Sequence, residues 1–133
     1  MTTMTSQTNR AENIRTLSMP AVLLHAEGLT VLIGAIILYA HLGASALLFA
    51  LLLFVPDVSM IGYMKNPKVG SLLYNVVHTY ITPSLLLLVS LLAGSALGTQ
   101  IALIWVAHIG MDRTMGYGLK YPTQFKDTHF TRV

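Results

Sequence analysis

Five ionisable side chains lie inside, or near the ends of, long apolar runs of this sequence. They are Glu27, Asp57, His78, His108 and Asp112. An ionisable group in such surroundings costs roughly 3 kcal/mol or more unless it is paired or hydrated. Imidazole nitrogen and carboxylate oxygen are ligands that zinc, manganese and iron take from proteins, and the same groups transfer protons in acid–base catalysis. The residue types therefore indicate a metal centre or a proton-transfer site.

The spacing of these residues favours paired ligands on single helices. His108 and Asp112 are four residues apart, and Asn75 and His78 are three apart, so each pair shares one helix face. We predict a divalent metal ion, Zn, Mn or Fe, held by His78, His108 and Asp112. Asp57 would be the fourth ligand or a general base. No HExxH motif is present to fix the metal or the reaction.

Three more residues complete the candidate catalytic set. Glu27 would be the acid, Asn75 an orienting hydrogen-bond donor, and Arg113 a clamp for an anionic headgroup. His25 and Glu27 are two residues apart and must point in different directions from one helix. We expect Glu27 to face the site, because a carboxylate in lipid costs more than a neutral imidazole. Each polar residue taken alone would also serve as an interhelical hydrogen-bonding group.

Composition indicates a membrane protein. Of the 133 residues, 54% are hydrophobic and only 10% are charged, which leaves too little polar surface for a soluble domain of this size. The absence of cysteine excludes disulfides and thiolate metal sites. The net charge of +3 comes from residues at the ends of the apolar runs, so we expect contact with a lipid bilayer and no nucleic-acid partner.

Four apolar runs have the length needed to cross a bilayer. They predict spans at about 20–40, 45–64, 71–93 and 99–119. The connections between them are short, which makes neighbouring helices antiparallel. We therefore predict an all-α fold, a four-helix transmembrane up-down bundle in residues 19–133 with a short C-terminal tail. Residues 1–18 are polar and are expected to form a disordered, flexible N-terminal tail.

Lys and Arg are distributed on one side of this arrangement. The first and third connections carry none, whereas the N-terminal segment, the second connection and the C-terminal end carry them all. The positive-inside rule then predicts a multi-pass protein of the inner (cytoplasmic) membrane with both termini in the cytoplasm. With this topology, each of the four spans brings a polar candidate residue to one layer near the cytoplasmic leaflet.

Three kinds of function remain open at this stage. The preferred one is metal-assisted hydrolysis of a lipid-like substrate. The second is metal-free acid/base chemistry, as in an isomerase or cyclase acting on an apolar, isoprenoid-like substrate. The third is a proton-coupled carrier or a membrane partner subunit. Four short spans leave little room for alternating access, so a carrier would have to be a homo-oligomer.

Several stretches of the sequence resemble the DUF4260 family of small bacterial integral membrane proteins. They are PAVLLHAEGL (20–29), PDVSMIGYM (56–64), VGSLLYNVVHTYITP (69–83) and ALIWVAHIGMDRTMGYGLKYPTQFKDTHF (102–130). The resemblance implies a small four-span membrane protein and no assigned activity. The positions similar to the family's characteristic polar residues are Glu27, Asp57, Tyr63, Asn75, His78, Tyr80, Trp105, His108, Asp112, Arg113, Tyr117, Lys120, Tyr121, Asp127 and His129.

The C-terminal segment that follows the last apolar run contains the helix breakers Gly116, Gly118 and Pro122. Its charged and aromatic residues come just after the predicted site. We therefore weigh two hypotheses for residues 122–133: a lid or headgroup-binding segment that folds back over the site, and a plain solvated tail.

Overall fold

The computed structural model describes residues 18–120, and this part of the chain is entirely helical, without a strand. The elements are α1 (Met19–His41), α2 (Ala46–Leu52), the 3-10 helix η2 (Val55–Met64), α3 (Pro67–His78), α4 (Ile81–Leu92) and α5 (Ala96–Met115). The prediction of an all-α fold is confirmed, whereas the four-helix bundle is not. The predicted N-terminal tail, apart from residue 18, and the predicted C-terminal lid lie outside the described residues.

Two of the four predicted spans are interrupted, and each interruption comes four residues before a proline. Proline lacks an N–H and its ring clashes with the carbonyl of the residue four positions earlier. Pro56 acts in this way on Leu52, where α2 ends and the chain continues as the 3-10 helix η2. Pro83 acts on Thr79, whose backbone is extended, and α3 and α4 meet there at an angle of 40°.

The described helices give fewer candidate membrane spans than the four predicted. In the part of the chain described, two segments are long and apolar enough to cross a membrane, Met19–His41 and Ala46–Met64. The bent pair α3 and α4 is a third if it counts as one span. The fourth predicted span, 99–119, does form a helix, α5, but α5 carries too many polar groups to be one of these candidates.

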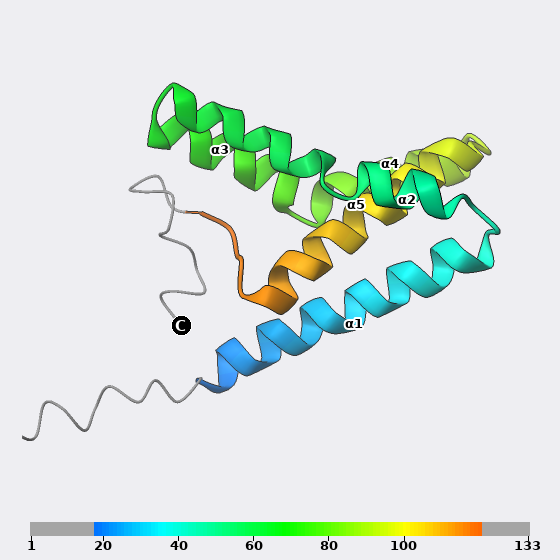
Figure 1. Cartoon of the computed structure of the whole chain (residues 1–133), viewed down its shortest axis with the longest axis horizontal. Coiled ribbons are helices and arrows are strands. Elements are labelled where there is room, and N and C mark those ends of the chain that lie inside the picture. The colour runs from blue at the N-terminus through cyan, green and yellow to red at the C-terminus, as the bar shows by residue number, and fades with distance from the viewer. Residues whose placement is uncertain (1–17, 121–133) are drawn as a thin grey trace, which may run out of the picture.

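Helix α5 is the central element of the fold. It runs between α1 on one side and α3, α4 and η2 on the other (Figure 1). Its buried residues span its length from Thr99 to Arg113. An apolar core forms where Tyr39 of α1 packs with Leu103 and Ile104 of α5. These two residues of α5 precede His108 and Asp112. The polar side chains of α5, among them His108, Asp112 and Arg113, are thus buried against neighbouring elements of the protein.

Helices α1 and α5 cross at two glycines that allow their backbones to approach closely. A Cβ on Gly28 would collide with Arg113, and a Cβ on Gly110 would lie only 2.8 Å from the backbone nitrogen of Leu32. Small residues at a crossing are the usual means of close helix contact in membranes. Just beyond this crossing α5 stops at Gly116, whose φ of 91° turns the chain towards Lys120.

Candidate metal centre

Four side chains from three elements meet at one point. They are Asp57 of η2, His78 at the end of α3, and His108 and Asp112 of α5. Each offers one ligand atom, and these four atoms all lie within 4.8 Å of one another. The structure thus brings together the four residues that the sequence analysis assigned to metal binding.

The local backbone explains how these residues meet. Asp57 directly follows Pro56 in the first turn of η2, where the chain has left the α-helical path. His78 is the last residue of α3, next to the break at Thr79. The two prolines that interrupt the predicted spans therefore also set the positions of two of the four candidate ligands. His108 and Asp112 need no such device, since they are one turn apart on α5.

The separations between the ligand atoms are short and nearly equal. Nε2 of His78 and Nε2 of His108 are 3.1 Å apart. Asp57 Oδ1 lies 3.4 Å from the first of these nitrogens and 3.3 Å from the second. Asp112 Oδ2 lies 3.5 Å and 3.3 Å from the same two atoms. Four nitrogen and oxygen ligands at 2.0–2.1 Å from a tetrahedral zinc ion stand about 3.3–3.4 Å apart. The five edges above are close to this value, and the sixth edge, between the two carboxylate oxygens, is within 4.8 Å.

The orientation of His78 directs a lone pair into this cluster. Its Nδ1 lies 3.0 Å from the carbonyl oxygen of Tyr74, which can only accept a hydrogen bond. The Nδ1–H therefore donates, and Nε2 of the neutral ring is unprotonated. A metal-ligating histidine commonly has its other nitrogen bound to a carbonyl in this way. Nδ1 of His108 is buried, and the backbone of Leu53 lies near enough to the ring to act as a hydrogen-bond partner.

Three of the four residues are shielded and one is open. His78 is 1% exposed, His108 is fully buried and Asp112 is 8% exposed. The side chain of Asp57, in contrast, is 38% exposed. Two carboxylates and two neutral imidazoles carry a net charge of −2, which a divalent cation would neutralise in this weakly solvated place. Asp57 marks the side from which water or a substrate can approach.

The broken end of α3 is bonded by side chains from other elements. The indole N–H of Trp105 donates to the carbonyl of Val77 at 2.7 Å, and Nη2 of Arg113 donates to the carbonyl of His78 at 3.1 Å. Thr82 donates to the carbonyl of Val76. Arg113 also reaches the carbonyl of Tyr117 at 3.4 Å and is only 8% exposed. The guanidinium predicted as a headgroup clamp therefore lies against backbone carbonyls within the protein.

Asn75 and Lys120 connect the end of the described chain to α3. The Asn75 amide donates to the carbonyl of Lys120 and accepts from its N–H, both at 2.7 Å. The Lys120 ammonium lies 4.7 Å from the centre of the Tyr74 ring. That ring is stacked on His78 with centroids 3.7 Å apart. Burial lowers the pKa of Lys120, and the nearby Asp112 opposes the shift.

Of the two neighbouring polar residues on α1, His25 bonds to α5 and Glu27, predicted to face the site, is exposed. Nδ1 of His25 lies 2.9 Å from the carbonyl oxygen of Thr114 on α5, whereas Glu27 is exposed and not part of the cluster. His25, Gly28 and Leu32 share the face that crosses α5, and Glu27 is about 100° away from Gly28 on the helix. The position of the glycine at the crossing decides which polar neighbour turns inward.

Tyr74 and Trp105 contact the site, and neither is among the residues predicted to take part in its chemistry. Tyr74 stands four residues before His78, a spacing that predicts a side-chain contact on one helix face. Trp105 shares a face with His108, yet nothing in the sequence identifies the carbonyl it binds. The carbonyl of Val77 is free to accept this bond because α3 ends one residue later and leaves it without a partner in the helix.

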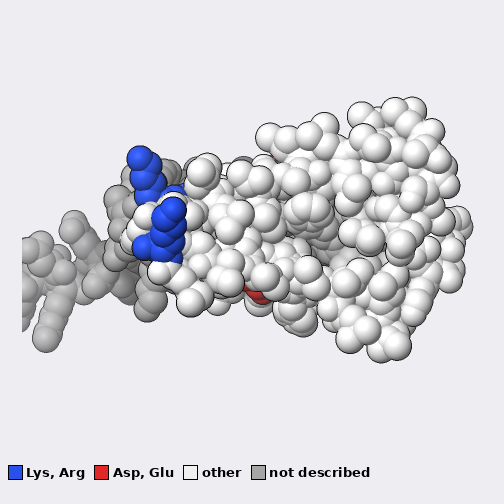
Figure 2. Space-filling view, turned by 90° about the horizontal axis from the view of Figure 1, so that it is seen from above, with Lys and Arg blue, Asp and Glu red and all other residues white. Residues whose placement is uncertain are grey.

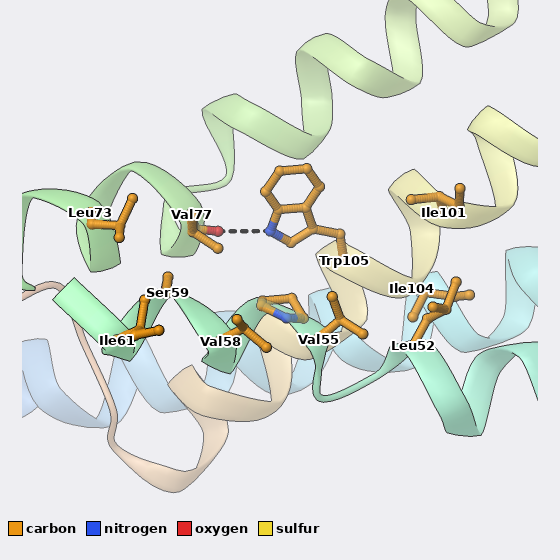
Figure 3. Close-up of a pocket in the computed structure, with 11 residues that line it drawn as sticks. Leu52, Val55, Val58, Ser59, Ile61, Leu73, Val77, Ile101, Ile104 and Trp105 are labelled. Carbon is orange, nitrogen blue, oxygen red and sulfur yellow. Dashed lines mark hydrogen bonds between the residues drawn. The ribbon is translucent and has the colours of Figure 1, made fainter.

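An apolar pocket of about 430 Å³ lies among α2, η2, α3 and α5, and none of its lining residues belongs to the cluster. It is lined by Leu52, Val55, Pro56, Val58, Ser59, Ile61, Leu73, Val77, Ile101, Ile104 and Trp105. Pro56 and Val77 are the chain neighbours of Asp57 and His78, so the pocket and the cluster share parts of η2 and α3. In Figure 3 the indole N–H of Trp105 is bonded to the Val77 carbonyl, so the ring presents mainly hydrocarbon to the pocket.

Comparison with known proteins identifies the family of the chain. The model of the DUF4260 family, described as a domain of unknown function, matches residues 21–133. The matched range contains all four residues of the cluster. No curated protein and no solved structure matches the chain.

Proposed function

The chain belongs to the DUF4260 family, and from its site we propose that it is a membrane protein with a divalent metal centre that hydrolyses a lipid-like substrate. His78, His108 and Asp112 would hold the ion, which we take to be zinc before manganese or iron. Asp57 would complete the centre or act as the general base.

The observation that carries this proposal is the set of five separations between 3.1 and 3.5 Å. In the absence of a cation or of further protons on the imidazoles, unprotonated nitrogens and two carboxylates would face one another at these distances. Such an arrangement is unfavourable in a weakly polar environment. A single dication satisfies all four groups, and the separations suit its bond lengths.

The apolar pocket supports a substrate with a hydrocarbon part. Its lining offers aliphatic side chains and the face of one indole, so it would hold a chain by burial of apolar surface. With its hydrocarbon chain in this pocket, a substrate would hold its scissile ester near Pro56, which directly precedes Asp57 in the chain. This placement is what favours hydrolysis of a lipid-like molecule over that of a polar solute.

The charge distribution supports a membrane location for this chemistry. In the space-filling view, Lys and Arg gather at one end of the molecule and the rest of the visible face is almost free of charge (Figure 2). Lys65 and Lys68, between η2 and the first turns of α3, are exposed. We propose that this end faces the cytoplasm, as the positive-inside rule predicts.

A divalent ion held by these residues would supply Lewis acidity and lower the pKa of water. The residues of the chain have distinct parts in the reaction. Asp57, the most exposed carboxylate of the cluster, would accept a proton from the attacking water. The buried histidines and Asp112 would keep the centre fixed. The pocket lining would exclude water from the acyl part of the substrate.

Metal content tests the centre directly. Elemental analysis of detergent-purified protein should find about one divalent ion per chain. The double variant His78→Ala/His108→Ala should contain no such ion, and its affinity for added zinc should be lower by more than about 100-fold. His41→Ala is the matched control, because His41 is exposed at the far end of α1 and should leave the metal content unchanged. Metal-free wild-type protein that also binds no added zinc would disprove the centre.

Activity tests the hydrolytic step separately. A chromogenic ester with a long acyl chain should be cleaved faster than its short-chain analogue, because the pocket would bind the longer chain. Asp57→Asn should reduce cleavage by about 100-fold or more while leaving zinc bound, if Asp57 is the base. Equal cleavage by Asp57→Asn and wild type would remove that role. Equal rates for the two esters would argue against a lipid-like substrate.

One observation also supports the metal-free alternative. The 3.1 Å separation of the two histidine nitrogens is a hydrogen-bond length, so the pair could share a proton instead of a metal ion. The cluster would then be an acid–base centre for an isoprenoid-like substrate. This function would be favoured if the wild-type protein binds no zinc and NMR shows proton exchange at both imidazoles.

A further inference from the structure

We propose that Asn75 is a positioning residue that holds the imidazole of His78 towards the cluster through Lys120 and Tyr74. This inference deepens the proposed function and rests on it only where metal binding is concerned. Asn75 does not belong to the cluster itself, and its side chain is committed to the backbone of Lys120.

The first step is the pairing between Asn75 and Lys120. The side-chain amide makes two hydrogen bonds of 2.7 Å, one as donor and one as acceptor, to the N–H and carbonyl of a single residue. Such a two-point contact fixes both the position and the direction of the partner backbone. The two residues are 45 positions apart, so the contact attaches the segment after α5 to α3.

The second step is the position that this attachment gives to the lysine side chain. Lys120 is 6% exposed, and its ammonium lies 4.7 Å from the centre of the Tyr74 ring. A cation at this distance from an aromatic ring is attracted to it, and more strongly where both are shielded from water. Tyr74 is only 2% exposed. The lysine therefore restrains an aromatic ring that has little room to move.

The third step is the transfer of this restraint to His78. The Tyr74 and His78 rings are stacked with an interplanar angle of 7° and centroids 3.7 Å apart. The carbonyl of Tyr74 also accepts the Nδ1–H of His78. Stacking sets the plane of the imidazole, and the hydrogen bond sets which nitrogen faces away. Together they leave Nε2 directed at His108, Asp57 and Asp112.

Two variants separate positioning from general stability. Asn75→Ala removes both bonds to Lys120. Asn66→Ala is the matched control, because the Asn66 side chain makes one structural bond, from the N–H of Val69 at 2.8 Å, at the start of the same helix. Loss of that helix cap should lower stability without changing the ring of His78. Asn75→Asp keeps the acceptor for the Lys120 N–H and should give an intermediate result.

The first readout needs no metal. Nitrogen NMR of the histidine rings in the full-length, metal-free protein should show His78 as the single Nδ1–H tautomer in wild type and in Asn66→Ala. Asn75→Ala should show exchange between both tautomers, and Lys120→Met, which keeps the apolar stem, should do the same to a smaller extent. A single unchanged tautomer in Asn75→Ala and Lys120→Met would overturn the inference.

The second readout is Co²⁺ binding, which reports ligand geometry through its visible absorption. Asn75→Ala should lower the affinity for Co²⁺ by about 10-fold and should shift the absorption bands. This is the lower end of the effect of losing a residue that supports a metal ligand. Asn66→Ala should stay within twofold of wild type. If wild type binds no Co²⁺ but Asn75→Ala still releases the tautomer, the metal centre fails and the positioning role stands. If wild type binds and both readouts are unchanged in Asn75→Ala, the positioning role fails alone.

Discussion

Helix α5 has two very different neighbours along its length. Against α1 it makes a tight crossing at Gly28 and Gly110, where no side chain separates the backbones. Against η2 and α3 it faces interrupted helices, buried polar groups and a pocket of about 430 Å³. The first contact is built for close packing, and the second contains the proposed ligand site. The comparison suggests that one helix can serve as both the scaffold and the site.

Removal of metal should affect the two sides unequally, and this is the largest effect we expect. A ligand present at about 100 times its Kd adds about 2.7 kcal/mol to stability, which a chelator would remove. Amide hydrogen exchange should then rise in η2 and α3 and change little in α1. Equal increases in all three would show that the two contacts of α5 are not independent.

Packing at the crossing should respond to a single methyl group. Gly28→Ala places a Cβ against Arg113 and the backbone of Thr114, and we expect a loss of about 2 kcal/mol. Gly34→Ala on the same helix meets nothing within 4 Å and should stabilise by about 0.5–1 kcal/mol through helix propensity. Thermal unfolding in one detergent measures both. A similar midpoint for the two variants would mean that the crossing is looser than the structure shows.

The same contrast explains what could be predicted from the sequence. The residue types and the one-turn spacing of His108 and Asp112 predict their pairing, because a regular helix fixes it. The contributions of Asp57 and His78 depend on where two helices break, which the prolines indicate but do not fully specify. The choice between His25 and Glu27 depended on a crossing at Gly28, a tertiary contact that no local pattern reveals.

The end of α3 should respond more weakly than the crossing. Trp105→Phe keeps an aromatic ring but removes the donor to the carbonyl of Val77. A buried carbonyl that loses its partner costs about 1 kcal/mol or somewhat more. Chemical unfolding should therefore show a loss of this size, with zinc affinity within about threefold of wild type. A 100-fold loss of affinity would mean that Trp105 also orients His78.

The smallest effect should come from the exposed side of α1. Glu27 lies outside the cluster and is exposed, so Glu27→Gln should change zinc affinity by less than about twofold in a titration of the purified protein. His25→Ala should instead lower stability by about 1 kcal/mol, because the carbonyl of Thr114 loses its partner. A tenfold loss of zinc affinity in Glu27→Gln would mean that Glu27 does contribute to the site. It would also require α1 to rotate about its axis, and the backbone contact at Gly28 leaves no room for that rotation.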